Sequence, residues 1–331
     1  MKTCVIFGGT GFIGSHLAQQ LSQTGEFDDI VLADIAPIRS DFQFDARVRH
    51  VAVDVRLPIE QWPPLPDKVN LIANFAAVHR EPGHANNEYY ETNLPGAESV
   101  CAWAEKIRCH NLIFTSSIAP YGPSEEAKTE SSIPTPVSGY GGSKLAAEKI
   151  HLAWQRAASG RRLVIVRPGV VFGPGERGNV TRLVQATLRR YFFYMGNRQT
   201  RKAGGYVKEL VNTMLWALAR VPDTGGVYLY NFTMPQPPTV QEYVETTAQV
   251  AGVSRWIPSF PFRVLLLVSY AVEMVARPLM IQQPISPVRV RKLVRSNNIV
   301  PAALQRDGYA YLFTLEKAMA DWKHNRPDEW K

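Results

Sequence analysis

The chain has 331 residues, of which 45% are hydrophobic and 20% are charged, a composition typical of a globular protein with a sizeable core. A formal charge of +8 favours an anionic partner, but the sequence has no basic block or nucleic-acid-binding motif, which argues against nucleic acid. Cys4, Cys101 and Cys109 are scattered and lack metal-ligand spacing, so we expect no metal site and reduced thiols in a cytoplasmic protein.

The first apolar run, residues 2–7, leads into a glycine-rich turn and then into a helical pattern over 15–22. Gly9, Gly11 and Gly14 have the G-x-G-x-x-G spacing of a turn that receives a dinucleotide pyrophosphate. Glycines let the backbone approach the phosphates, and the helix that follows offers unpaired N–H groups. The sequence therefore predicts a dinucleotide site built on Gly8, Gly11, Phe12, Ile13 and Gly14.

Acidic and small residues end the next apolar runs. Asp34 closes a second run, over 30–33, where a carboxylate can accept both hydroxyls of the adenosine ribose; this favours NAD over NADP, although Arg39 nearby leaves NADP open. Asp54 and Val55 close a third run, over 49–53, and are candidate neighbours of the adenine. A fourth run, over 69–76, ends in Ala76 and Ala77, whose small side chains would let the backbone pass close to a cofactor.

Further runs over 111–115 and 163–166, with a long helical pattern over 89–106, continue the alternation of strands and helices. This spacing predicts an α/β protein with a Rossmann-like, doubly wound parallel sheet, whose ligands sit at the carboxyl ends of the strands. We expect an NAD-binding domain over 1–175, to which a helix and strand around 206–232 return. Residues 176–331 would then form a smaller, irregular substrate domain.

Candidate catalytic residues follow the fifth strand. Tyr140 and Lys144 are four residues apart, which places them on one face of a helix. A phenol has a pKa near ~10, and a close ammonium group together with the nicotinamide charge would lower it. Tyr140 could then exchange a proton with a hydroxyl during hydride transfer, while Ser117 at the strand end holds the same oxygen.

These motifs together identify a resemblance. Residues 8–14, 89–93, 114–122, 140–144 and 167–175 resemble the extended short-chain dehydrogenase/reductase family, and within it the NAD-dependent nucleotide-sugar epimerases and dehydratases. The resemblance is close over about 1–215 and loose beyond. It implies that Tyr140 is the acid–base, Lys144 the ribose anchor and pKa tuner, and Ser117 the orienting hydroxyl, with Ser116 as the alternative serine.

The resemblance also implies further contacts. Asn93 would support the active site, although a helix-capping asparagine is an equally simple interpretation. Pro168 and Val171 would line the cofactor. The expected substrate contacts are Asn179 at the diphosphate, Lys202 at a position where the family often has arginine, and His79 in the loop 79–84 over the nicotinamide.

The sequence departs from the family's dehydratases. Most of them carry an Asp-Glu pair after the serine to drive elimination, and Ile118-Ala119 stands there instead, which argues against a sugar 4,6-dehydratase. We therefore expect an NAD-dependent epimerase acting at C4 of a UDP-hexose or UDP-N-acetylhexosamine. The alternatives are a net oxidoreductase of a keto-sugar or hydroxysteroid-like lipid alcohol and, more remotely, a non-catalytic dinucleotide-binding protein. A homodimer formed through a helix pair is also implied.

One apolar stretch, residues 260–280, raises the question of a membrane. Glu273 and Arg277 interrupt it, and its uninterrupted part is shorter than the ~20 residues that a transmembrane span needs. A buried or capping helix is the simplest interpretation. An interfacial helix, in peripheral contact with a membrane or covering an apolar ligand, is the alternative.

Overall fold

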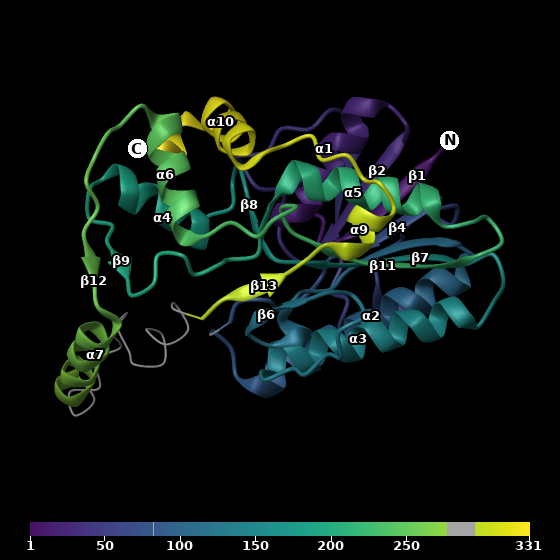
Figure 1. Cartoon of the computed structure of the whole chain (residues 1–331). Helices are drawn as coiled ribbons and strands as arrows, with labels where there is room; N and C mark the ends of the chain where they lie inside the picture. Colours follow the sequence, from purple (N-terminus) through teal and green to yellow (C-terminus); the bar gives the residue numbers. More distant parts are fainter. Residues whose placement is uncertain (82, 277–294) are drawn as a thin grey trace.

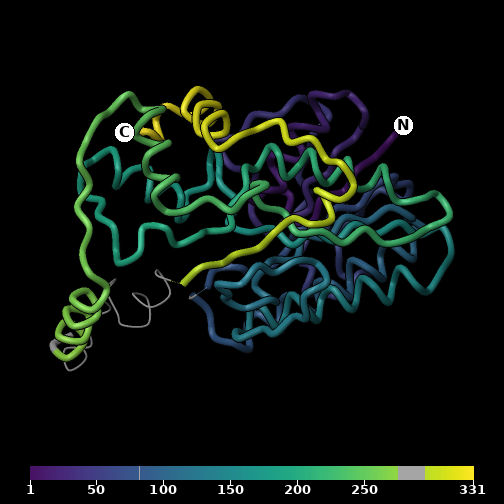
Figure 2. Tube along the Cα trace, viewed as in Figure 1, coloured from purple at the N-terminus to yellow at the C-terminus, as the bar shows by residue number. Residues whose placement is uncertain are grey.

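The fold is built on a parallel sheet, as the sequence predicted. A computed structural model describes residues 1–81, 83–276 and 295–331 (Figures 1 and 2). Seven strands pair in the order β11-β7-β5-β4-β1-β2-β3. Their bounds are β1 (Thr3–Phe7), β2 (Asp29–Asp34), β3 (Val48–Ala52), β4 (Leu71–Asn74), β5 (Asn111–Thr115), β7 (Arg162–Pro168) and β11 (Gly226–Phe232).

Helices cover both faces of this sheet, so its strands are apolar on both sides (Figure 1). Ile6 of β1 packs with α1 (Phe12–Thr24) and α5 (Val207–Arg220), whereas its neighbours Val5 and Phe7 pack with α2 (Asn86–Lys106) and α3 (Gly139–Arg156). All three β1 side chains are fully buried. Because successive side chains alternate between the faces, two apolar layers need an unbroken apolar run, which explains why the sequence shows no period of two.

The edge strand β11 comes from the second half of the chain. It lies parallel to β7, with Gly226 opposite Arg162 and Phe232 opposite Pro168. The helix before it, α5, packs on the same layer as α1. Residues 206–232 therefore lie on the main sheet.

A second core holds the remaining helices together. Side chains of α4 (Asn179–Leu188), α6 (Val240–Ala251) and α10 (Leu315–Asn325) surround Phe172, and Tyr243 and Trp322 are its ring neighbours. The other elements are short. They are β6 (Ser124–Lys128), β8 (Val170–Phe172), β9 (Tyr194–Met195), β10 (Gly204–Tyr206), β12 (Ser259–Phe260), β13 (Asn297–Ile299), α9 (Ala302–Arg306) and the 3-10 turns Ile59–Gln61, Ala119–Tyr121 and Pro327–Trp330.

The expectation of a buried helix over 260–280 is wrong for the part that the structure describes. Helix α7 (Phe262–Ala276) exposes large apolar side chains, among them Leu267 at 71% and Met274 at 77% of their surface. Residues 277–280 lie outside the described part of the chain. Within the described ranges, no helix is long and apolar enough to cross a membrane.

Candidate active site

The glycine turn between β1 and α1 is closely packed at three of its four glycines. Gly8 has a left-handed φ of 72°, and its N–H donates to the carbonyl of Ala33 at 2.9 Å. A Cβ on Gly14 would lie 2.5 Å from the Gly8 oxygen, and one on Gly9 would lie 2.6 Å from the Ile6 oxygen. A Cβ on Gly11 would meet only the Gly8 oxygen, at 3.1 Å. The turn is therefore closely packed against the protein at Gly8, Gly9 and Gly14 and has free space at Gly11.

This open side fits a dinucleotide. Gly11 is the N-cap of α1 and provides no side-chain cap, so the first-turn N–H groups, including those of Phe12 and Ile13, have no partner from a capping side chain. Asp34 ends β2 beside the turn, where its carboxylate accepts the N–H of Thr10 at 3.2 Å and that of Ala36 at 3.0 Å. Uncapped N–H groups next to a carboxylate that is expected to bind ribose match the two ends of an adenosine diphosphate.

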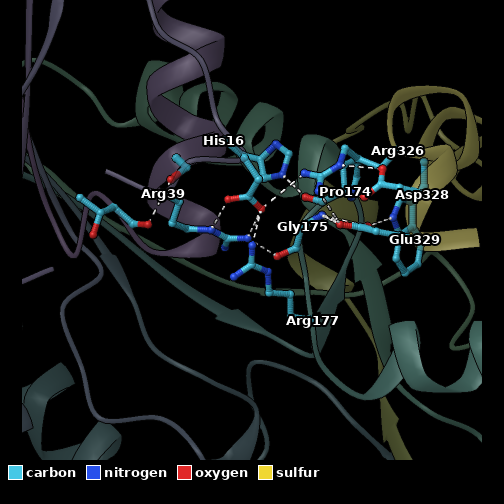
Figure 3. A network of polar contacts seen from close by, with 12 residues as sticks. His16, Arg39, Pro174, Gly175, Arg177, Arg326, Asp328 and Glu329 are labelled. Atoms are coloured by element: carbon cyan, nitrogen blue, oxygen red, sulfur yellow. Dashed lines mark hydrogen bonds and ion pairs between the residues drawn. The ribbon is translucent and has the colours of Figure 1, made fainter. Parts of the chain in front are cut away.

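Arg39, which left NADP open, is held within the protein. It donates to both oxygens of Asp41, at 2.9 and 2.6 Å, and to the carbonyl of Gly175 at 2.8 Å (Figure 3). The Asp41 carboxylate also faces Arg177 and Arg326, at 3.2 and 3.4 Å. A guanidinium bound in this way is not available to a 2′-phosphate unless the Asp41 contact breaks.

The other predicted cofactor neighbours lie at the ends of β3 and β4. A Cβ on Gly8 would lie 2.6 Å from the backbone nitrogen of Ala76, so the glycine turn and the Ala76-Ala77 segment are in direct contact. Asp54 is paired with Arg56 at 2.6 Å, and this guanidinium lowers the pKa of the carboxyl. Val55 is buried, and its side chain leaves no room for a Cβ on Gly96 of α2.

Helix α3 and the end of β5 bring the candidate catalytic side chains together. Tyr140 lies close enough to Ser117 for this side chain to lower the tyrosine's pKa, and the Ser117 oxygen accepts the N–H of Ala119 at 3.1 Å. Lys144 lies one turn further along α3 and donates to the carbonyl of Thr115 at 2.8 Å. Its ammonium group lies 4.9 Å from the centre of the Phe114 ring. Tyr140 and Lys144 of α3 therefore lie together at the carboxyl end of β5, near Ser117, which is the arrangement that the sequence suggested.

The pKa of Tyr140 is shifted in the opposite direction to the expected one. Burial raises the pKa of Tyr140 to about 12, with the Ser117 hydrogen bond acting against it. Burial lowers the pKa of Lys144 to about 8, against the raising effect of the Glu148 carboxylate. The protein alone therefore does not supply the lowered tyrosine pKa, because burial outweighs the lowering effect of Ser117. A bound cofactor's positive charge would have to provide it.

A buried ion pair behind these residues was missed from the sequence. Arg167 of β7 donates to both carboxylate oxygens of Glu148, which also accepts the hydroxyl of Ser116 at 2.5 Å. Ser116, the alternative serine, is therefore engaged by Glu148, and Ser117 is the serine that faces Tyr140. Glu148 follows Lys144 by four residues, so the helical spacing already placed it on the same face.

Asn93 and His79 lie close to the same helix. Asn93, in the middle of α2, accepts the N–H of Val78 at 2.9 Å and donates to the hydroxyl of Ser143 at 2.9 Å. It is therefore not a helix cap; it connects the segment after β4 to α3. Burial lowers the pKa of His79, and the Lys144 charge lowers it further. Of the loop 79–84, residue 82 is outside the described part.

The remaining predicted contacts are less closely connected. Pro168 ends β7, and its carbonyl accepts the N–H of Ile118 at 3.1 Å; Val171 is half-buried in β8. Asn179 is exposed at the start of α4. Lys202 donates to the carbonyl of Arg295 at 2.7 Å, and burial lowers the pKa of its ammonium to about 8. The structure describes no group of His, Cys, Asp and Glu side chains that could hold a metal ion.

Comparison with known proteins agrees with this geometry. Residues 4–230 match the NAD dependent epimerase/dehydratase family. The chain is 29% identical over 248 residues to N-acetyl-alpha-D-glucosaminyl-diphospho-ditrans,octacis-undecaprenol 4-epimerase of Escherichia coli O157:H7, covering 74% of each chain. It is 25% identical over 326 residues to a decarboxylating sterol-4-alpha-carboxylate 3-dehydrogenase of Candida albicans, covering 91% of each.

Solved structures share the fold. The UDP-N-acetylglucosamine 4-epimerase of Methanobrevibacter ruminantium, in complex with UDP-N-acetylmuramic acid, superposes with a TM-score of 0.76 at 17% identity and covers 99% of each chain. MoeE5, in complex with UDP-glucose and NAD, superposes with a TM-score of 0.71 at 23% identity and covers 99% of this chain and 100% of its own. The overall fold of this chain is therefore one that known proteins share.

Proposed function

Because the chain belongs to the NAD-dependent epimerase/dehydratase family and NAD is its cofactor, we propose that it is a 4-epimerase of a nucleotide sugar, a UDP-hexose or UDP-N-acetylhexosamine. The observation that carries the proposal is the placement of Tyr140 beside Ser117, one helical turn from buried Lys144. The 4-epimerases among its relatives and structural neighbours support the reaction type.

The residues divide the reaction among them. Bound NAD supplies reversible hydride acceptance at the carbon that changes configuration. Ser117 holds the C4 hydroxyl, and Tyr140 takes its proton as the 4-keto sugar forms and returns it after the sugar has turned its other face. Lys144 provides positive charge and a ribose contact, and Asp34 accepts the adenosine ribose hydroxyls. In this proposal Asn179 and Lys202 contact the diphosphate, and His79 approaches the sugar.

A net oxidoreductase is the second candidate. The sterol dehydrogenase of Candida albicans matches over more of this chain than the undecaprenol-linked sugar epimerase does, and its name states a 3-dehydrogenase activity. A keto-sugar or a hydroxysteroid-like alcohol would use the same tyrosine, serine and lysine. The sugar could also be carried on a lipid diphosphate instead of UDP, since the name of the Escherichia coli O157:H7 epimerase includes a diphospho-undecaprenol.

The organisation of the protein is part of the proposal. Residues 1–175, with 206–232, would bind NAD, and the rest of 176–331 would select the substrate. We infer a homodimer through α2 and α3, which pack against each other on one face of the sheet. A cytoplasmic location remains an expectation from the cysteines.

One assay separates the two reactions. Purified protein is tested for co-purified NAD and then incubated with UDP-sugars without added cofactor, while the absorbance of reduced nicotinamide is followed. Epimerisation predicts interconversion of the two sugars with no net change in that absorbance. Dependence on added NAD with stoichiometric reduction would instead establish the oxidoreductase.

The Tyr140→Phe variant tests the mechanism. It should lose at least ~100-fold in turnover and keep its unfolding temperature, because only the proton-transferring hydroxyl is removed. Tyr191→Phe is the matched control, since Tyr191 is 60% exposed. Undiminished turnover in Tyr140→Phe would refute the assigned role.

A further inference from the structure

Helix α7 belongs to a lobe that stands apart from the sheet. We define the α7 lobe as residues 188–200 and 253–276. Its two segments are joined where β12 pairs with β9: the N–H of Tyr194 donates to Pro258, and that of Gly196 donates to Phe260. The Phe193 and Phe260 rings are also in contact, 5.2 Å apart. Both views show α7 projecting from this lobe, away from the sheet (Figures 1 and 2).

One side of α7 is an exposed apolar stripe. Leu267 and Val268 follow Val264 by three and four residues, and Met274 follows Leu267 by seven, so all four lie on one side of the helix. They are exposed at 48% (Val264), 71% (Leu267), 50% (Val268) and 77% (Met274). Trp256, just before β12, is 82% exposed. Single exposed apolar residues are ordinary on a protein surface, but a stripe along three turns of one helix marks an interaction surface.

The charges of the lobe select the kind of partner. Its two segments carry five arginines (Arg189, Arg190, Arg198, Arg255 and Arg263) against one acidic residue, Glu273. Four of these arginines are exposed; Arg255 is the half-buried one, and its guanidinium donates to the carbonyl of Thr187 at 2.8 Å. An apolar stripe next to exposed cations complements a surface that is apolar inside and negatively charged outside.

We propose that the α7 lobe docks the protein on an anionic phospholipid membrane. Helix α7 has 15 residues and is too short to span a bilayer, so its stripe lies along the interface and the arginines reach the headgroups. Exposed Trp256 would be a further contact of the lobe, since tryptophan is enriched at membrane–water boundaries. A second copy of this chain is a less suitable partner, because the arginines of two α7 lobes would repel each other.

The described chain that follows the lobe begins beside a residue proposed to contact substrate. The described chain resumes at Arg295, whose carbonyl accepts the Lys202 ammonium, and continues into β13, which pairs with β6. Strand β6 follows Ser117 closely in sequence. A sugar carried on a lipid would suit a protein docked in this way, and this extension rests on the proposed function. The docking itself does not depend on the proposed reaction.

The test is co-sedimentation of the full chain with vesicles of phosphatidylglycerol and phosphatidylcholine, compared with phosphatidylcholine alone. The wild type should bind the anionic vesicles, and binding should weaken with salt. Leu267→Glu with Met274→Glu should bind at least ~10-fold more weakly. Ile133→Glu is the matched control, because Ile133 is 81% exposed outside the lobe.

The outcomes are separable. Absence of wild-type binding, or equal binding by the double variant, would overturn the proposal. If the wild type does not bind vesicles and the double variant has a different oligomeric state, the stripe is a contact between two copies of the chain. This result would also overturn the proposal. An unchanged unfolding temperature of the double variant shows that its fold is intact. Because vesicle binding is measured without substrate, loss of docking is also distinguished from failure of the proposed epimerase activity.

Discussion

Arg167 donates to the two carboxylate oxygens of Glu148 at 2.8 and 2.6 Å, and both side chains are buried. The pair joins the carboxyl-terminal part of β7 to the middle of α3. Through Ser116 it reaches the residue next to the orienting serine, and through Tyr121, at 2.6 Å from Arg167, it reaches the turn that follows β5. The proposed catalytic side chains therefore rest on a buried charge network.

Replacing Glu148 by Gln leaves the Arg167 charge buried without its partner. We expect a loss of about 3–5 kcal/mol in unfolding free energy, measured by denaturant titration. The pKa of Lys144 should also fall, because the Glu148 carboxylate raises it. If turnover needs the ammonium form, its alkaline limb moves to lower pH. The control is Lys149→Gln, exposed on the same helix; an unmoved alkaline limb in Glu148→Gln would argue against the link to Lys144.

Two alanine substitutions in the glycine turn should behave differently. Gly14→Ala places a methyl group 2.5 Å from the Gly8 oxygen and should lower both stability and NAD binding. Gly11→Ala meets only one atom, at 3.1 Å, and φ at Gly11 is −67°, so it should fold nearly normally. It should still weaken NAD binding at least ~10-fold, since the pyrophosphate is proposed to pass over this position. Calorimetry with NAD and thermal unfolding measure the two effects, and equal losses in both variants would contradict the assignment.

Asp41→Asn should change the choice of dinucleotide. Loss of the carboxylate charge weakens the contact with Arg39, which is then free to approach a 2′-phosphate. We expect NADP binding to rise relative to NAD, as measured by calorimetry, and Arg39→Ala in the same background to reverse it. Asp45→Asn, which disturbs the more exposed pair with Arg47, is the control. An unchanged ratio in Asp41→Asn would show that Asp34 alone excludes NADP.

Buried histidines predict a loss of stability in mild acid. Burial lowers the pKa of His16 and of His151 to about 4. His16 is neutral and donates to the Pro174 carbonyl, while His151 donates to that of Ala147. A folded-state pKa below the unfolded one means that the unfolded chain binds more protons between pH 6.5 and 4. As the pH is lowered through this range, the free energy of unfolding should therefore decrease, by up to about 1.4 kcal/mol per pH unit for each histidine.

Denaturant titrations at pH 6.5, 6.0 and 5.5 measure this slope above about pH 5, where the carboxylates with lowered pKa values begin to contribute. His79, whose pKa is also lowered, adds to the wild-type slope. The variants His16→Gln and His151→Asn should each show a shallower slope. A slope equal to the wild type in both would contradict the role of these two side chains.

Much of the site could be predicted because it depends on local spacing. Tyr140 and Lys144 lie on one face of their helix because they are four residues apart. Ser117 follows a strand of a parallel sheet, and the carboxyl ends of all strands in such a sheet lie at the same edge. The glycine turn, Asp34 and Ala76 follow from the same rule. Long apolar runs between helical patterns likewise determined the sheet.

Pairings between distant segments could not be predicted in this way. The strands β8 and β10 have three residues each and exist only because they pair with each other across more than 30 positions of the chain. Glu148 was on the predicted helix face, but nothing in the sequence named Arg167 as its partner. Partner choice among buried charges is set by packing in three dimensions.

The sequence by itself determined the parallel sheet, the dinucleotide turn and the shared face of Tyr140 and Lys144. Only the tertiary structure decided that Ser116 is engaged by Glu148, that Arg39 is held by Asp41, and that the α7 stripe is exposed. Periodicity places a side chain on one face of its own element, whereas burial, pKa and hydrogen-bond partners depend on what the rest of the chain packs against that face.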